Sequence, residues 1–461
     1  MSQYAYANID DTIVALATPQ GVGAIAVIRL SGKDCIALVN KVFKGKDLMR
    51  QEPNTIHFGT IRDGEKILDE VLVSLFKAPH SFTKENSVEI SCHGSQYIVR
   101  QIIQLLIREG ARAALPGEFT KRAFANGQFD LAQAEAVADL IHSDSEASHQ
   151  AALSQMRGGF SNEIKELRQK LIHFASMIEL ELDFSEEDVE FASRDELKAL
   201  INRLLEVVNH LIKSFDLGNV IKNGIPTVIA GKPNAGKSTL LNALLNEEKA
   251  IVSDIAGTTR DFIEDELHIE GMCFRFIDTA GLRHTEDKVE AIGVERTQEK
   301  MKDASLIIYL FDLVEDSVSE ILQEVNKLEN LGKPFVPVGN KIDAASPAVI
   351  DQLQGSEHSW QFISADKGTN IEQLKAELVS QVNLPEFKTG DTIVTNIRHY
   401  ESLVKTREAL HDVLNGIGLQ VTGDFLAMDI RQSLHHLGEI TGEITTDDLL
   451  SNIFSSFCIG K

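Results

Sequence analysis

Residues Gly231–Thr239 read GKPNAGKST, and this stretch decides the fold of the chain around it. It satisfies the pattern G-x-x-x-x-G-K-[ST], which is typical of a loop that wraps phosphate groups. Before it, Pro226–Ala230 (PTVIA) predicts a short buried strand, and after it the apolar side chains of Leu240–Leu245 predict a helix. Backbone N–H groups at the start of such a helix can point at phosphate oxygens, and the helix dipole favours the anion.

Two side chains of this loop have expected roles. Lys237 would neutralise the β- and γ-phosphates, and the Ser238 hydroxyl would coordinate Mg²⁺. A glycine-rich turn that binds nothing is the alternative for an isolated match. Four further motifs, in the order that a guanine-nucleotide switch requires, argue against that alternative.

The first two of these motifs suit the metal and the γ-phosphate. Asp254–Asp261 reads DIAGTTRD, a polar loop in which Thr258 and Thr259 can reach Mg²⁺ and the γ-phosphate. Asp278–Gly281 reads DTAG and directly follows the alternating run CFRFI. An aspartate at that strand end can hold magnesium through its water shell, and Gly281 offers a backbone N–H to the γ-phosphate.

The other two motifs suit the base. Asn340–Asp343 reads NKID after the strand-like run FVPVG, and Asp343 can accept two hydrogen bonds from guanine. Adenine lacks that pair of donors, so it would leave the carboxylate desolvated and unpaired. Ser364 and Ala365, in FISADKG, are expected to complete the base pocket with backbone N–H groups. The five motifs together predict a GTP-binding domain.

Composition limits the class of protein. The chain has 461 residues, which predicts two to four domains. It is 43% hydrophobic and 25% charged, as in a soluble globular protein, and its net charge is −24. That net charge argues against binding nucleic acid through the overall charge of the protein, although a local basic face is compatible with it.

Cysteine usage and hydropathy predict a cytoplasmic protein. The four cysteines show no C-x-x-C pair, so neither disulfides nor a zinc site is expected; they are Cys35, Cys92, Cys273 and Cys458. The first residues lack the basic region and apolar core of a signal peptide. No run of 18 apolar residues predicts a membrane span.

Changes of pattern along the chain predict a multidomain protein. Residues 1–120 carry strand-like runs and one amphipathic helix, which indicates an α+β domain. Residues 121–217 are helical in pattern. The last helix of this stretch is expected to end near Phe215, and a glycine-containing linker follows it. Residues 218–383 form the α/β GTP-binding domain, and residues 384–461 return to helical pattern. The simplest architecture inserts the GTP-binding domain between two halves of one helical domain.

Several polar residues have ordinary structural interpretations. Arg29 and Glu89 could be paired strand residues, and His93 a turn histidine. The pair His435–His436 suits a helix surface better than a metal site, because no acidic or cysteine partner has ligand spacing. The end FSSFCIGK makes a poor prenylation signal; its Cys458 lies either on a frayed tail or in the cleft of another domain.

The whole chain resembles the MnmE (TrmE) family of tRNA-modification GTPases. The marks are PGEFTKRAFANGQFDLAQAEAVADLI, GKPNAGKST, DIAGTTRD, DTAGLR and the terminal CIGK. The resemblance implies a homodimer whose N-terminal domain binds 5-formyl- or 5,10-methylene-tetrahydrofolate. It also implies a heterotetramer with the flavoprotein MnmG that adds an aminomethyl or carboxymethylaminomethyl group to C5 of the wobble uridine of certain tRNAs, with GTP hydrolysed to GDP and phosphate.

The resemblance also assigns residues. It places folate contacts at Arg29, Glu89, Gln128 and Lys461, a functional cysteine at Cys458 and a catalytic glutamate at Glu290. Gln128 departs from the basic residue that relatives often have. The expected GTP contacts are Asn234, Ala235, Gly236, Lys237, Ser238, Thr239, Ser253, Asp254, Ile255, Ala256, Gly257, Thr258, Thr259, Asp278, Thr279, Ala280, Gly281, Asn340, Lys341, Asp343, Ser364 and Ala365.

Two metal ions are expected beside GTP. Mg²⁺ would be held by Ser238 and Thr259, and K⁺ by Asn234, Ser253, Ile255 and Thr258. Many switches use an arginine finger, but no residue identifies itself as one here; Arg260 and Arg283 only flank the motifs. A potassium ion held by neutral oxygens could supply that positive charge. The residue after DTAG is Leu282, which cannot orient water by hydrogen bonding.

Two other functions stay open. A GTP-driven switch that assembles ribosomal RNA would share the middle motifs, but it would lack a folate-type N-terminal domain and a terminal CIGK. A stand-alone folate-dependent methyltransferase would leave the GTP-binding domain unexplained. Folate binding, measured by equilibrium dialysis, distinguishes the ribosomal RNA assembly hypothesis from the tRNA-modification hypothesis.

Overall fold

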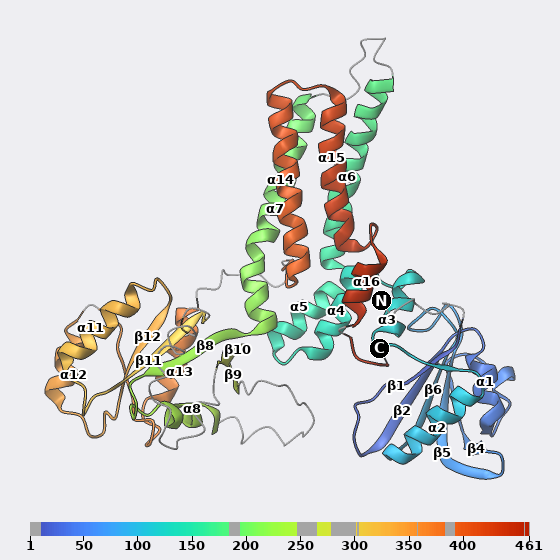
Figure 1. Cartoon of the computed structure of the whole chain (residues 1–461), viewed down its shortest axis with the longest axis horizontal. Helices are drawn as coiled ribbons and strands as arrows, with labels where there is room; N and C mark the ends of the chain where they lie inside the picture. The colour runs from blue at the N-terminus through green and yellow to red at the C-terminus, as the bar shows by residue number, and fades with distance from the viewer. Residues whose placement is uncertain are drawn as a thin grey trace. The chain divides into compact units, whose positions relative to one another are not determined.

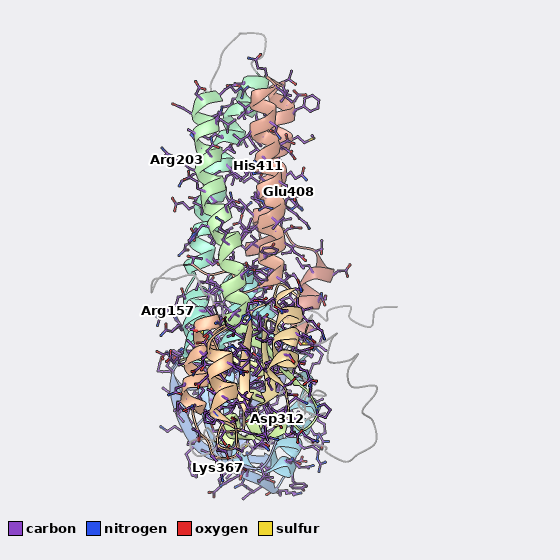
Figure 2. All side chains as sticks on the ribbon, turned by 90° about the vertical axis from the view of Figure 1, so that its left-hand side faces the viewer. Arg157, Arg203, Asp312, Lys367, Glu408 and His411 are labelled. Atoms are coloured by element: carbon purple, nitrogen blue, oxygen red, sulfur yellow. The ribbon has the colours of Figure 1, made fainter. Side chains whose placement is uncertain are left out.

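The computed structural model describes residues 11–183, 194–246, 265–277, 301, 304–356, 358–382, 392–455 and 457–460. Figure 1 draws the chain as a ribbon and Figure 2 adds its side chains. The chain divides into two compact units. The first comprises Met1–His142, Ala152–Ile212 and Ile397–Lys461, and the second Ser143–Ala151 and Lys213–Asn396. None of the helices among the described residues combines the length and apolar character needed to cross a bilayer.

The first unit begins with a seven-stranded sheet in the order β3-β4-β5-β6-β2-β1-β7. Only β1 and β7 pair in parallel; the other neighbours are antiparallel. The elements are β1 Ile13–Leu16, β2 Gly23–Ser31, α1 Cys35–Val42, β3 Phe43–Lys44, the 3₁₀ turn Leu48–Arg50, β4 Thr55–Asp63, β5 Lys66–Phe76, β6 Ser87–Gly94, α2 Gln96–Arg108 and β7 Arg112–Ala113.

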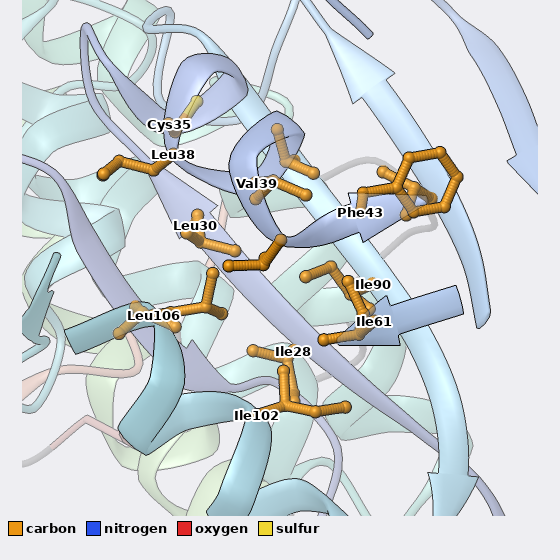
Figure 3. Packing of buried hydrophobic residues seen from close by; sticks show 14 of the residues in the cluster. Ile28, Leu30, Cys35, Leu38, Val39, Phe43, Ile61, Ile90, Ile102 and Leu106 are labelled. Atoms are coloured by element: carbon orange, nitrogen blue, oxygen red, sulfur yellow. The ribbon is translucent and has the colours of Figure 1, made fainter. Parts of the chain in front are cut away.

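Because successive side chains of a strand point to opposite sides, this sheet has two different faces. One face packs against α1 and α2, and Figure 3 shows Ile28, Leu30 and Ile90 of the strands meeting Val39 and Ile102 of the helices. On the other face Ile56 and Phe58 of β4 are exposed, and Leu72, opposite Phe58 in the register, is exposed too. On β1 this second face packs against Phe119 of α3 (Glu118–Ala125), so the apolar residues that stay exposed on it are those of β4 and β5.

The rest of the first unit is helical. In Figure 1 the long helices run beside one another, and α15 packs against both α6 and α14. Charged side chains on the outside of these helices, such as Arg203, Glu408 and His411, point away from the bundle (Figure 2). The helices that lie wholly in this unit are α3 Glu118–Ala125, α4 Leu131–His142, α6 Gly159–Asp183, α14 Ile397–Gly418, α15 Gly423–Thr441 and α16 Asp447–Ser455. Two further helices, α5 Glu146–Met156 and α7 Arg194–Asn223, are divided between the two units.

The second unit contains a six-stranded sheet in the order β13-β12-β11-β8-β10-β9, parallel except for the β9–β10 hairpin. Apolar clusters cover both faces of the central strands, which is why β11 is buried along its whole length. Its elements are β8 Ile225–Gly231, α8 Lys237–Asn246, β9 Asp265–Ile269, β10 Met272–Phe276, β11 Leu306–Asp312, α11 Val318–Glu329, β12 Phe335–Asn340, α12 Pro347–Gln354, β13 Gln361–Phe362 and α13 Ile371–Gln381.

The predicted fold class is confirmed: an α+β N-terminal part, a helical part and an α/β unit with a phosphate loop. The predicted domain boundaries stay predictions. One local prediction is wrong, because α7 continues to Asn223 where we expected a linker after Phe215. Gly218 lies inside this helix since the backbone of Val394 packs on it, and a Cβ there would come within 2.0 Å of the Val394 carbonyl oxygen.

A buried ion cluster ties the start of α14 to α4 and α15. Glu135 accepts hydrogen bonds from Arg398 at 2.7 and 3.1 Å, and the His399 Nε2 lies 2.8 Å from the same carboxylate. Arg398 also donates to the carbonyls of Glu439 and Ile440 at the end of α15. Burial by itself would raise the pKa of Glu135, but His399 and Arg398 outweigh it and lower the pKa to about 2.

We predict that Glu135→Gln destabilises the first unit. The substitution leaves the Arg398 charge buried without its counter-ion, which typically costs about 3–5 kcal/mol. The midpoint of thermal unfolding should fall clearly, while Glu166→Gln, at an exposed carboxylate, should leave it nearly unchanged. Equal midpoints for the two variants would contradict this account.

The same cluster makes a pH prediction. Because the folded pKa of Glu135 is about 2 and its ordinary value is 4.5, the stabilisation is fully present above about pH 4.5 and is lost as the pH falls towards 2. Glu135→Gln should therefore remove this part of the acid dependence of the unfolding midpoint.

Candidate functional site

The phosphate loop joins β8 to α8, and its glycines are required by close contacts. Gly231 has φ +146°, and a Cβ there would lie 2.3 Å from the Leu310 carbonyl oxygen on the neighbouring strand. Gly236 has φ +97°, and a Cβ there would lie 2.3 Å from the Asn340 Nδ2. Asn234 also has positive φ, at 62°. The loop therefore curls tightly between two strands, as a phosphate-binding loop must.

Lys237 is held at this loop by backbone carbonyls. Its Nζ donates to the carbonyl oxygens of Gly231 and Lys232, at 2.8 Å each. Burial lowers the pKa of Lys237 from its ordinary value. The ammonium group thus lies inside the loop, where an incoming phosphate would meet it.

A single buried amide links the phosphate loop to the base-binding motifs. Asn340 is 3% exposed at the end of β12. Its Nδ2 donates to the Ala235 carbonyl at 2.8 Å, and its Oδ1 accepts from the Ala365 amide at 3.0 Å. The two ends of a nucleotide site are therefore joined through one side chain.

Between these loops lies a cavity of about 300 Å³. A second hollow of about 390 Å³ shares Thr239 and Asp366 with it and adds Asn242, Ala243, Ala365, Lys367, Gly368 and Ile371. The exposed Asp343 borders the first cavity, where a base would present its edge. The first cavity is lined by Asn234, Gly236, Thr239, Asn340, Lys341, Asp343, Ala344, Ser364 and Asp366.

An ion pair that the sequence reasoning missed positions Lys341. Its Nζ donates to the buried Asp312 at the carboxyl end of β11. Burial raises the pKa of Asp312, but the hydrogen bond from Lys341 outweighs it and the net shift is downward. The Lys341 pKa is raised by the same bond. The signal was available, since the strand Leu306–Asp312 ends in a carboxylate at the edge where the other motifs end.

The base loop differs from the prediction in its hydrogen bonds. The Ser364 amide donates to the Thr369 carbonyl at 3.2 Å, and the Ala365 amide donates to Asn340 instead of facing the cavity. The following residues, Asp366 and Lys367, line the hollows as well, and Figure 2 labels Lys367 on this unit. Their place directly after Ser364 and Ala365 was the missed signal.

Part of the predicted site lies outside the described residues. These positions are Ser253, Asp254, Ile255, Ala256, Gly257, Thr258, Thr259, Asp278, Thr279, Ala280, Gly281 and Glu290, together with Lys461. The predictions for them therefore stand untested. Ser238 and Thr239 follow Lys237 at the start of α8, and Thr239 lines both cavities.

The first unit contains a second candidate site around Arg29. Arg29 and Glu89 lie opposite each other on β2 and β6, and the Arg29 Nε donates to the Glu89 Oε1 at 2.9 Å. The guanidinium carbon lies 5.6 Å from the ring centre of Phe82 and 5.9 Å from that of Phe119. A planar charged group flanked by aromatic rings is suited to a flat polar ligand.

The carboxyl-terminal tail reaches this site. Arg29 Nη1 donates to the Gly460 carbonyl at 3.4 Å, and Gly460 (φ +98°) packs so closely on Leu16 that a Cβ would lie 2.2 Å from its carbonyl oxygen. Phe457 is buried against α4 and α16, while Cys458 is an exposed free thiol between these two anchors. The tail is thus docked rather than frayed.

Gln128 is less closely connected to this site. Its side chain is exposed, and its amide donates to the Ala123 carbonyl at 2.8 Å. Its neighbour Phe129 lies 5.8 Å from the Phe82 ring, which in turn faces Arg29. The structure therefore groups Arg29 and Glu89 directly, and places Gln128 near them only through two rings.

Known proteins resemble the chain over its whole length. Residues 131–458 match the MnmE helical domain and residues 12–128 match the GTP-binding protein TrmE N-terminus. A tRNA modification GTPase MnmE of Cytophaga hutchinsonii is 62% identical over 461 residues, with 100% of both chains covered, and one of Christiangramia forsetii is 54% identical, covering 98% of this chain and 100% of the relative.

Among solved structures, the FeoB G-domain from Methanococcus jannaschii is 20% identical, covers 35% of this chain and 98% of its own, and has a TM-score of 0.26. The full-length identities and the two matching family models carry the assignment on their own. This chain belongs to the MnmE family of tRNA modification GTPases.

Proposed function

We propose that this chain hydrolyses GTP to GDP and phosphate as part of a tRNA modification reaction. The observation that carries the proposal is the cavity bordered by the phosphate loop on one side and by Asn340, Lys341 and Asp343 on the other. A nucleotide there would place its phosphates on the N-terminus of α8 and its base against Asp343. Family membership supports the same conclusion.

The finer chemistry that we propose follows the family. With the flavoprotein MnmG, in a heterotetramer, the chain would add an aminomethyl or carboxymethylaminomethyl group to C5 of the wobble uridine of certain tRNAs. The one-carbon unit would come from a 5-formyl- or 5,10-methylene-tetrahydrofolate bound near Arg29 and Glu89. The pairing of these residues and the two phenylalanine rings beside them support a site for a flat heterocycle.

Two metal ions belong to the proposal. Mg²⁺ would be held by Ser238 and Thr259, and K⁺ by Asn234 with Ser253, Ile255 and Thr258. Of this set the described Asn234 borders the cavity, and its amide oxygen is a neutral donor suited to a monovalent cation. Bound there, the cation would supply positive charge near the β–γ bridge during hydrolysis.

We also propose that the protein is a homodimer and acts in the cytoplasm. An exposed apolar patch on the N-terminal sheet supports dimerisation, because Ile56, Phe58 and Leu72 lie next to one another across β4 and β5. The free thiols of all four cysteines are compatible with a reducing compartment. Partners beyond the second copy are MnmG and tRNA.

Guanine specificity should depend on Asp343. We expect Asp343→Asn to bind GTP weakly and to accept xanthosine triphosphate, because the amide can donate where xanthine now accepts. Binding of both nucleotides by fluorescence competition measures the switch. Asp351→Asn on α12, an exposed aspartate outside the cavity, is the matched control. A variant at Asp343 that still prefers GTP would show that this motif does not read the base.

Hydrolysis should require potassium. Replacing K⁺ by Na⁺ at constant ionic strength should slow single-turnover hydrolysis sharply and weaken pairing of GTP-binding domains with a transition-state analogue. Asn234→Ala should lose most of the K⁺ response and keep Mg²⁺-dependent GTP binding. Equal rates in K⁺ and Na⁺ would exclude the potassium mechanism.

The same hydrolysis assay tests Glu290. Glu290→Ala should bind GTP nearly normally and hydrolyse it slowly.

Modification should need Cys458 and Arg29 while GTP hydrolysis should not. Cys458→Ser removes a thiol outside every nucleotide motif, so GTPase rates should stay intact while mass spectrometry of tRNA finds no modified wobble nucleoside. Arg29→Ala should lose folate binding in equilibrium dialysis. A normal modified tRNA pool in the Cys458→Ser strain would argue against the role of the thiol.

A further inference from the structure

The β9–β10 hairpin gathers three metal-binding side-chain types on one surface. His268 and Cys273 lie directly opposite each other in the antiparallel register, so their side chains share a face of the hairpin. Glu266 is two residues before His268 on β9 and therefore also points to that face. The hairpin alone thus offers an imidazole nitrogen, a thiol sulfur and a carboxylate oxygen.

A fourth side chain comes from the segment just before α5. Asp144 belongs to the same compact unit as the hairpin, within Ser143–Ala151. One ligand atom from each of Asp144, Glu266, His268 and Cys273 lies within 4.8 Å of every other. Cys273 is buried, His268 is half-buried, and the two carboxylates are exposed. The donors therefore converge on one point at the protein surface, from three separate stretches of chain.

We propose that these four residues bind a divalent transition-metal ion, with Zn²⁺ as the best match. Four donors of mixed nitrogen, sulfur and oxygen type suit tetrahedral zinc. Mg²⁺ and Ca²⁺ prefer six or more oxygen ligands and make little use of sulfur or imidazole. Binding replaces the proton of the Cys273 thiol by the metal, so one proton is released per ion bound.

Charge around the cluster agrees with a metal. With the Cys273 thiol ionised, the four ligands carry three negative charges, and a divalent ion reduces the total to −1. Arg275 lies opposite Glu266 in the register and is therefore placed to offset the remaining charge. The same arginine keeps a positive group beside the carboxylates when the ion is absent.

This site is separate from the nucleotide cavity. The hairpin forms one edge of the sheet, whereas Asn340 ends β12 near the opposite edge. None of the four ligands lines either hollow beside the phosphate loop. The inference therefore does not depend on GTP binding, and a bound ion would fasten the segment that carries Asp144 to the hairpin.

The test is zinc binding by the full-length chain stripped of metal. Titration against a chromophoric zinc chelator should find one tight site per chain. Cys273→Ser and His268→Gln should each lower zinc affinity by more than the roughly 10–100-fold that loss of an outer partner costs, and Asp144→Asn should lower it as well. Co²⁺ should give the near-ultraviolet charge-transfer absorption of a thiolate ligand, and Cys273→Ser should abolish it.

Two matched controls address other thiols and histidines. Cys458→Ser removes an exposed cysteine elsewhere, and His93→Gln removes an exposed histidine that lies 2.8 Å from the Asp69 carboxylate. Both should bind zinc like the natural chain. Circular dichroism of every variant separates lost binding from lost folding. Unchanged affinity in folded Cys273→Ser or His268→Gln, or no tight site in the natural chain, would overturn the proposal.

Discussion

The nucleotide unit depends on the two hydrogen bonds of the Asn340 side chain. One bond holds the phosphate loop through Ala235 and the other holds the base loop through Ala365. Because the amide is buried, loss of either bond would leave a polar atom unsatisfied, which costs about 1–3 kcal/mol. The same amide explains Gly236, since any side chain there would collide with it. The joining of the two loops and the glycine at position 236 therefore follow from one residue.

The parallel sheet is what makes that bridge possible. The strands β8, β11 and β12 run in the same direction, so their carboxyl ends deliver the phosphate loop, Asp312 and Asn340 to one edge. Apolar clusters on both faces of the sheet hold these strands in register with one another. An error of one residue in register would move Asn340 by about 3.3 Å along the strand and turn its side chain to the other face of the sheet, so core packing sets the geometry of the polar site.

The features that we predicted correctly are those that depend on the spacing of residues along the chain. The phosphate loop, NKID and the strand before each follow from local pattern and lie where expected. The Asp312–Lys341 pair, the use of the Ala365 amide by Asn340 and the helical Gly218 were missed. Each depends on a residue distant in sequence, which periodicity cannot report. Cys273 is a further example. It is not part of a C-x-x-C pair, so the sequence did not predict that Asp144, Glu266 and His268 would lie beside it in the fold.

The carboxyl-terminal tail is held by contacts on both sides of Cys458. Gly460 packs on the backbone of Leu16 and gives its carbonyl to Arg29, while Phe457 is buried with Phe454. These two anchors lie on either side of Cys458, so ordering the thiol needs no further contact of its own. Arg29 already engages Glu89, and its bond to Gly460 is longer, at 3.4 Å against 2.9 Å. Arg29 is therefore shared between the sheet, through Glu89, and the tail, through Gly460, and its bond to the tail is the longer of the two.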